Sequence, residues 1–185
     1  AAAEQALEAA HGALNALKTE FSLDDLTVPV PSPGELAEAL GGAALVQALL
    51  PLPFHITWVD SREAIFPSDV PAQVVVEHSD PIEAAVAGLA PGSSIFILTH
   101  NHQQDLQITL ACLQRLRHQP DLGMVGLIGS ATKRASFAHR VEERGFTDAE
   151  FARITCPIGI PGIHGKAPEV IAIAAAAQLL QTLHF

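Results

Sequence analysis

GMVGLIGSATKR, residues 123–134, is the stretch that decides the expected fold. Its first half is a short apolar run, residues 124–128, which Gly129 and Ser130 bring to an end. The residues that follow place small and apolar side chains at helical spacing. We therefore predict a strand, a tight turn and a helix, with Ser130 as the helix N-cap and with Gly129 allowing another group to approach the backbone.

Two cations, Lys133 and Arg134, lie in the first turn of this predicted helix. A helix start offers free amides and the positive end of the helix dipole, and both attract anions. Cations are unfavourable there, so the pair indicates an anionic ligand; the alternative is that both side chains point into solvent. If they hold an anion, replacing both with alanine should abolish its binding without unfolding the protein.

The composition favours one α/β domain. The chain has 185 residues, of which 49% are hydrophobic and only 5% aromatic, as expected for small-residue helices packed on a sheet. Its formal net charge of −10 argues against general binding to nucleic acid or anionic membranes, which requires a basic face. The two cysteines form no CxxC motif, no apolar run reaches the ~20 residues of a membrane span, and no secretory signal is recognisable. We expect a cytoplasmic protein.

Apolar runs alternate with helical patterns from residue 55 onwards. Strands are predicted over residues 55–59, 73–77, 94–99 and 124–128, and helices over 82–89, 103–118, 132–144 and 167–183. Continuous apolar strands are typical of parallel sheets covered by helices on both faces. The prediction is a Rossmann-like, doubly wound, mostly parallel sheet over residues 34–185, preceded by an N-terminal fragment and proline-rich linker at 1–33. Gly41-Gly42 predicts a break in the helical pattern before residue 50.

Polar side chains follow the predicted strands, where the ligand crevice of such a sheet lies. Asp60 directly follows the first strand and is suited to a ribose hydroxyl or, alternatively, to capping a turn. His100, His102 and Asp105 follow the third strand, and they suit a metal, an oxo group or a proton. The alternative is that His100 and Asn101 cap the next helix while His102 is solvated. We expect a ligand site there and leave the metal unidentified.

The segment ITCPIGIPGIHGKAPE, residues 154–169, has the composition of a loop packed into a site. Cys156 suits a small buried hydrophobe or a nucleophile. Lys166 precedes a helix expected to open at Pro168, which makes a second candidate seat for an anion.

Several of these pieces resemble, in order, the xanthine dehydrogenase accessory protein family (XdhC/CoxI). They are LPFHITWVDSRE at 52–63, THNHQQDL at 99–106, GLIGSATKR at 126–134 and CPIGIPGIHGKAPEVIAIAAAAQLL at 156–180. The resemblance implies a chaperone rather than an enzyme. Such a protein binds the molybdenum cofactor, supports its sulfuration by a cysteine desulfurase, and inserts it into a molybdenum hydroxylase such as xanthine dehydrogenase.

The molybdenum cofactor is a pterin with a phosphate and a metal-dithiolene end. Position and chemistry assign the phosphate to Ser130, Lys133, Arg134 and Lys166, and the pterin or molybdenum to His100, His102 and Cys156. The resemblance also implies a first strand and a G-x-G-H-x-G turn before ALVQALL at 44–50, where this sequence has AEALGGAALVQALL. A family amino-terminal domain has no counterpart beyond residues 1–33.

Two other functions stay open at this point. Asp60 after its strand also suits an NAD(P)- or nucleotide-dependent oxidoreductase-like enzyme. The alanine-rich face of residues 167–183 suits packing against a second subunit or, alternatively, packing in the core. We expect a homodimer.

Overall fold

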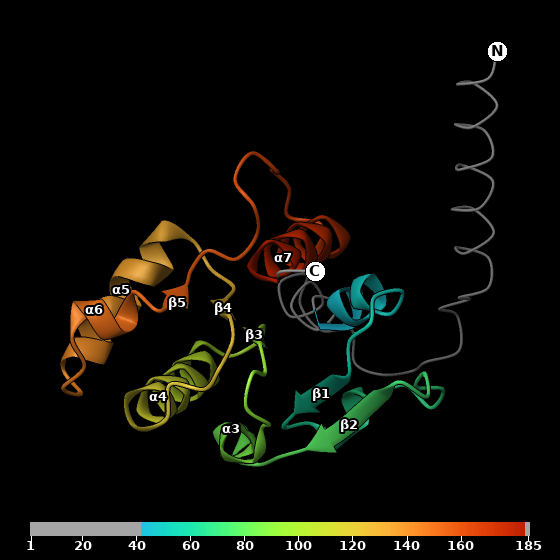
Figure 1. Ribbon diagram of the computed structural model, residues 1–185, viewed down its shortest axis with the longest axis horizontal. Helices are drawn as coiled ribbons and strands as arrows, with labels where there is room; N and C mark the ends of the chain where they lie inside the picture. Colours follow the sequence, from blue (N-terminus) through green and yellow to red (C-terminus); the bar gives the residue numbers. More distant parts are fainter. Residues whose placement is uncertain (1–41, 184–185) are drawn as a thin grey trace. The chain divides into compact units, whose positions relative to one another are not determined.

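The structure is a computed structural model that describes residues 42–183 (Figure 1). Residues 42–49 are helical. The strands are β1 Ile56–Asp60, β2 Val74–His78, β3 Ile95–Ile97, β4 Val125–Leu127 and β5 Ile154–Thr155. The helices are α3 Ala85–Gly88, α4 His102–His118, α5 Ala131–Glu142, α6 Asp148–Phe151 and α7 Pro168–Thr182, with short 3-10 turns η1 Glu63–Ile65 and η2 Ile82–Ala84. The predicted fragment at 1–33 lies outside the described residues, as does most of the stretch before residue 44 where the resemblance places a first strand and glycine turn.

All strand pairs in the described part of the chain are parallel, and they form two sheets. β1 pairs with β2, from Ile56 opposite Val74 to Asp60 opposite His78. β4 lies between β3 and β5 in the second sheet. Parallel strands alternating with helices confirm the predicted Rossmann-like class. The division into two sheets was not predicted.

Two helical layers cover the strands (Figure 1). One buried cluster joins β3, β4 and β5 to α4 and α5, and the other joins β1 and β2 to the helix at 42–49 and to α7. Ile97 of β3 faces the first cluster and Phe96 the second, and β1 divides in the same way between Val59 and Trp58. Side chains of both sheets therefore pack in the same two layers.

The alanine-rich helix α7 packs within its own chain. Three of its four buried alanines belong to the cluster that contains the helix at 42–49: Ala172, Ala175 and Ala176. Core packing, one of the two alternatives for this face, is what the structure shows. Within residues 42–183, none of the helices has both the length and the apolar character that crossing a bilayer requires.

The break predicted at Gly41-Gly42 lies partly outside the described residues, which begin within a helix at Gly42. The helix predicted over 82–89 is present as the 3-10 turn η2 followed directly by the short α3. One local prediction was wrong. The loop predicted from residue 154 begins with β5, which is only two residues long and therefore carries no recognisable periodicity.

The Glu150 carboxylate secures α6 and gives the fold a predictable acid sensitivity. It accepts hydrogen bonds from Arg117 Nε at 2.5 Å and from Thr147 N at 2.8 Å. The hydrogen bond with Arg117 lowers the pKa of Glu150 from its ordinary 4.5 to about 2. Because the folded pKa is depressed, this stabilisation is present above about pH 4.5 and is lost as the pH falls toward 2.

We therefore expect the Glu150→Gln variant to lose less stability than the wild type between pH 4.5 and pH 2. The measurement is the urea midpoint of both proteins across that pH window. Equal slopes for the two proteins would contradict the role assigned to this carboxylate.

Candidate functional site

A buried ion pair joins the segments that follow β3 and β4. Lys133 Nζ lies 2.5 Å from Asp105 Oδ2, and the two side chains are only 11% and 1% exposed. The other oxygen of Asp105 accepts hydrogen bonds from Thr99 N at 3.1 Å and from Thr99 Oγ1 at 2.7 Å. Asp105 thus ties the turn after β3 to the first turn of α5.

Ser130 is the N-cap of α5, as predicted, and its Oγ accepts a hydrogen bond from Lys133 N at 3.2 Å. A Cβ added to Gly129 would lie 2.7 Å from Lys133 Cδ. The group that approaches the Gly129 backbone is therefore the Lys133 side chain on its way to Asp105. The predicted close approach is present, with an internal partner.

Arg134 joins α5 to the segment that follows β5. Its Nη1 donates to the carbonyl oxygen of Ile154 at 3.1 Å and to that of Cys156 at 3.4 Å. Its guanidinium carbon also lies 5.2 Å from the centre of the Phe151 ring. Neither cation of the first turn points into solvent, and both already have partners inside the domain.

Asp60, the last residue of β1, and Arg62 form a closed ion pair. Both carboxylate oxygens of Asp60 accept hydrogen bonds from the Arg62 side chain at 2.9 Å, and Arg62 N donates to Asp60 as well. Burial raises the pKa of the Asp60 carboxyl, but the hydrogen bonds and charge of Arg62 outweigh it and, with His100, hold this pKa below its ordinary value. The carboxylate of Asp60 therefore caps the turn after β1, which is the second of the two roles predicted for it.

The two histidines after β3 have different surroundings. Asn101 caps α4 by accepting from Gln103 N at 2.7 Å, whereas His102 begins the helix and is exposed. His100 is half-buried and close enough to Asp60 to affect its pKa. No set of three or more His, Cys, Asp or Glu side chains among residues 42–183 has the arrangement of a metal site.

Cys156 follows β5 and is buried, at 7% exposure. Burial raises the pKa of its thiol; the charges of Lys133 and Arg134 oppose this and that of Asp105 reinforces it. The glycine-rich segment after it lies against α7, because Gly159 N donates to Gln178 Oε1 at 2.8 Å and Ile160 N to the Ala174 carbonyl at 3.2 Å. A packed loop was expected here.

The thiols have a testable reactivity. Burial raises the pKa of Cys112 to about 12, and this side chain is fully enclosed. Since the thiolate is the reactive form, we expect neither cysteine of the folded protein to react quickly with a thiol reagent at pH 8, and both to react in urea. If reaction is seen before unfolding, Cys156 should precede Cys112, and fast reaction of Cys112 would contradict its burial.

The structure thus brings together one group of the residues predicted from the sequence: Asp105, Gly129, Ser130, Lys133, Arg134 and Cys156. Asp60 and His100 form a second pair, and Gln104 Nε2 of α4 connects the turn after β1 to α4 by donating to Ser61 Oγ at 2.8 Å. Lys166 is exposed before α7, which begins at Pro168 as predicted. Thr99 was not predicted from the sequence, whereas Arg62, two residues after Asp60, belongs to the turn-capping alternative for that aspartate.

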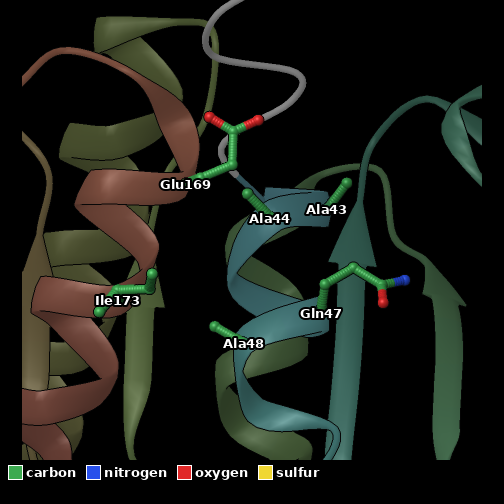
Figure 2. A pocket seen from close by; sticks show the side chains of 6 residues that line it. All are labelled: Ala43, Ala44, Gln47, Ala48, Glu169 and Ile173. Atoms are coloured by element: carbon green, nitrogen blue, oxygen red, sulfur yellow. The ribbon is translucent and has the colours of Figure 1, made fainter. Parts of the chain in front are cut away.

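A hollow of about 400 Å³ lies elsewhere, between the helix at 42–49 and α7. Figure 2 shows Ala44, Ala48 and Ile173 between the two helices, with Glu169 at one end. It contains none of the predicted site residues and little that would recognise a polar ligand. We therefore place the candidate site at the carboxyl ends of the strands.

Parallel strands between helices, with polar side chains joined beyond the strand ends, define a Rossmann-like domain. Residues 39–179 match the family described as the XdhC Rossmann domain, and the chain belongs to that family. It is similar to the uncharacterized protein YqeB of Escherichia coli K12, with 30% identity over 139 residues, 75% of this chain and 25% of that protein. It therefore spans about a quarter of this relative.

A solved structure has the same fold. It is a crystal structure of a xanthine dehydrogenase from Bacillus halodurans, with a TM-score of 0.62 and 22% sequence identity. The match covers 78% of this chain and 40% of that one. At this identity the likeness supports the fold alone.

Proposed function

We propose that this chain is the cofactor-binding domain of an accessory protein for a molybdenum hydroxylase related to xanthine dehydrogenase. In this proposal it binds the molybdenum cofactor, supports sulfuration of the cofactor by a cysteine desulfurase, and delivers it to the hydroxylase. The role is that of a chaperone and requires no turnover by the chain itself. Family membership motivates the proposal.

The observation that carries it is the network of side chains beyond the strand ends. Gln104 links the turn after β1 to α4, Asp105 links Thr99 to Lys133, and Arg134 reaches the Cys156 carbonyl. Four separate segments are thereby held at one edge, where a ligand of an open parallel sheet binds. A site fixed in this way is preorganised and loses less freedom on binding.

The donor groups fit a phosphorylated pterin with a metal end. The amides of Ala131 and Thr132 have no partner within the helix because of their position and, with the Ser130 hydroxyl, suit the phosphate, whereas the Lys133 amide already donates to Ser130 Oγ. His100 and Cys156 provide the imidazole and the thiol suited to a molybdenum centre. Lys133 and Arg134 have internal partners, so they shape this seat instead of serving as free cations. The bound group supplies the molybdenum chemistry, while the chain holds and shields it.

The alternative of a nicotinamide- or nucleotide-dependent enzyme depended on Asp60. Because both oxygens of this carboxylate already accept from Arg62, a ribose hydroxyl would have to compete with a charged partner. We therefore rank this alternative second. Measuring the melting temperature of the protein with NAD(P) and with nucleotides tests this alternative. A melting temperature raised by any of these ligands would favour the enzyme again.

The proposal also includes a cytoplasmic location and a homodimer. Cys112 and Cys156 are both free thiols, which agrees with a reducing compartment. Retention of the two proposed partners, the desulfurase and the hydroxylase, is measurable with the immobilised full chain.

The direct test mixes the protein with molybdenum cofactor and measures retention by gel filtration. We expect at least tenfold less retention for Ser130→Asp, since aspartate still caps α5 but puts a carboxylate at the phosphate seat. Thr147→Asp is the matched control, because Thr147 is the N-cap of α6, and it should bind normally. Wild-type retention no better than that of an unrelated acidic protein would refute the proposal.

A further inference from the structure

Strand β2 lies at the edge of its sheet in the part of the chain that the structure describes. Within residues 42–183 it pairs only with β1, and four of its five residues are exposed. Val75 is 62% exposed and Val76 is 39% exposed. Because successive side chains of a strand point to opposite faces, apolar surface is open to solvent on both faces of this edge.

This edge carries only one of the features that prevent strands from pairing, the charge of Glu77. Edge strands are usually protected by charged side chains, especially lysine, by proline, by a bulge or by a covering element. The sequence of β2, VVVEH, contains neither lysine nor proline, and the nearest prolines, Pro71 and Pro81, lie outside the strand. Its backbone groups are therefore suited to a further ladder.

We propose that β2 pairs in antiparallel orientation with β2 of a second copy of this chain, about a two-fold axis at Val75. Two-fold symmetry about an axis normal to the sheet puts one residue opposite its own counterpart, and charge decides which one. Centring on Glu77 puts two carboxylates face to face, and centring on Val76 leaves them as diagonal neighbours. Both are unfavourable for a chain with a formal charge of −10.

Centring on Val75 gives a complementary register. Val75 then faces Val75 of the partner copy, Val74 faces Val76, and Glu77 faces Gln73. The Gln73 amide is exposed and currently donates to the Leu50 carbonyl at 3.3 Å, a long bond that it would exchange for the carboxylate. The pairing is self-complementary in apolar and polar groups, which favours a second copy as the occupant.

This surface differs from the helix face considered earlier for a homodimer. Four of the five alanines of α7 are buried in their own chain, and Ile173, although 60% exposed, lines the hollow beside the helix at 42–49 on a helix whose backbone is already hydrogen-bonded. The pairing through β2 does not depend on the cargo, so its test needs no cofactor.

The test is disulfide trapping with single cysteine variants of the full chain under mild oxidation. Val75→Cys should give a cross-linked dimer, because residues directly opposite each other are ~5 Å apart at Cβ. Val76→Cys should cross-link at least fivefold less, since it faces Val74. Ile173→Cys is a control of matched exposure and should stay monomeric; the native cysteines are buried.

Sedimentation provides the second measurement. Val75→Lys should weaken self-association at least tenfold, whereas Ile173→Lys should leave it unchanged. A protein that is monomeric at all concentrations, or an Ile173→Cys variant that cross-links as well as Val75→Cys, would overturn the proposal. Stronger cross-linking through Val76 than through Val75 would overturn the register.

Discussion

Replacing Lys133 with methionine is expected to lower the free energy of unfolding by about 3–5 kcal/mol, because it removes one partner of a buried ion pair. Asp105 is 1% exposed, and the variant would leave its carboxylate with only the Thr99 hydrogen bonds. A buried charge without a counter-charge is costly. Urea unfolding of wild type and variant at neutral pH measures the loss.

Lys166→Met is the matched control, since this lysine is exposed and its loss should change stability by no more than ~0.5 kcal/mol. The double variant Asp105→Asn with Lys133→Met should be less destabilised than the sum of the two single variants, because no uncompensated charge is left. If Lys133→Met were as stable as Lys166→Met, the ion pair would not hold the site together.

This expectation revises what the sequence alone suggested for the two cations. From the sequence, alanine at both Lys133 and Arg134 was expected to abolish anion binding without loss of fold. In the structure, Lys133 forms an ion pair with Asp105, and Arg134 donates hydrogen bonds to the carbonyl oxygens of Ile154 and Cys156. We now expect that double variant to lose stability as well, so lost binding in it would not locate the phosphate. The Ser130→Asp variant separates the two effects.

The features that sequence predicted correctly are local ones. The strand and helix of residues 123–134 follow from an apolar run, a glycine and an N-cap serine, all within one stretch. The position of polar groups beyond the strand ends follows from the sheet class.

The features it missed depend on tertiary contacts. Asp105 and Lys133 are 28 residues apart in the sequence, and no sequence pattern predicts that their side chains form an ion pair. The sequence indicated that Gly129 allows another group to lie close to the backbone. Only the structure shows that this group is the Lys133 side chain. Likewise, β1 and β3 read as strands of one sheet, whereas hydrogen bonding places them in two.

Truncating Leu106 to alanine should lower the free energy of unfolding by about 2–5 kcal/mol. Leu106 is completely buried and follows Asp105 in α4, so it anchors the helix that positions this carboxylate. The variant should therefore also retain less molybdenum cofactor under conditions where part of the protein is unfolded. Ile173→Ala, at a helical position that is 60% exposed, is the control and should change stability by no more than ~0.5 kcal/mol. Equal urea midpoints for the two variants would contradict the packing described for α4. Normal cofactor retention by folded Leu106→Ala protein at low temperature would show that this leucine supports the site through stability alone.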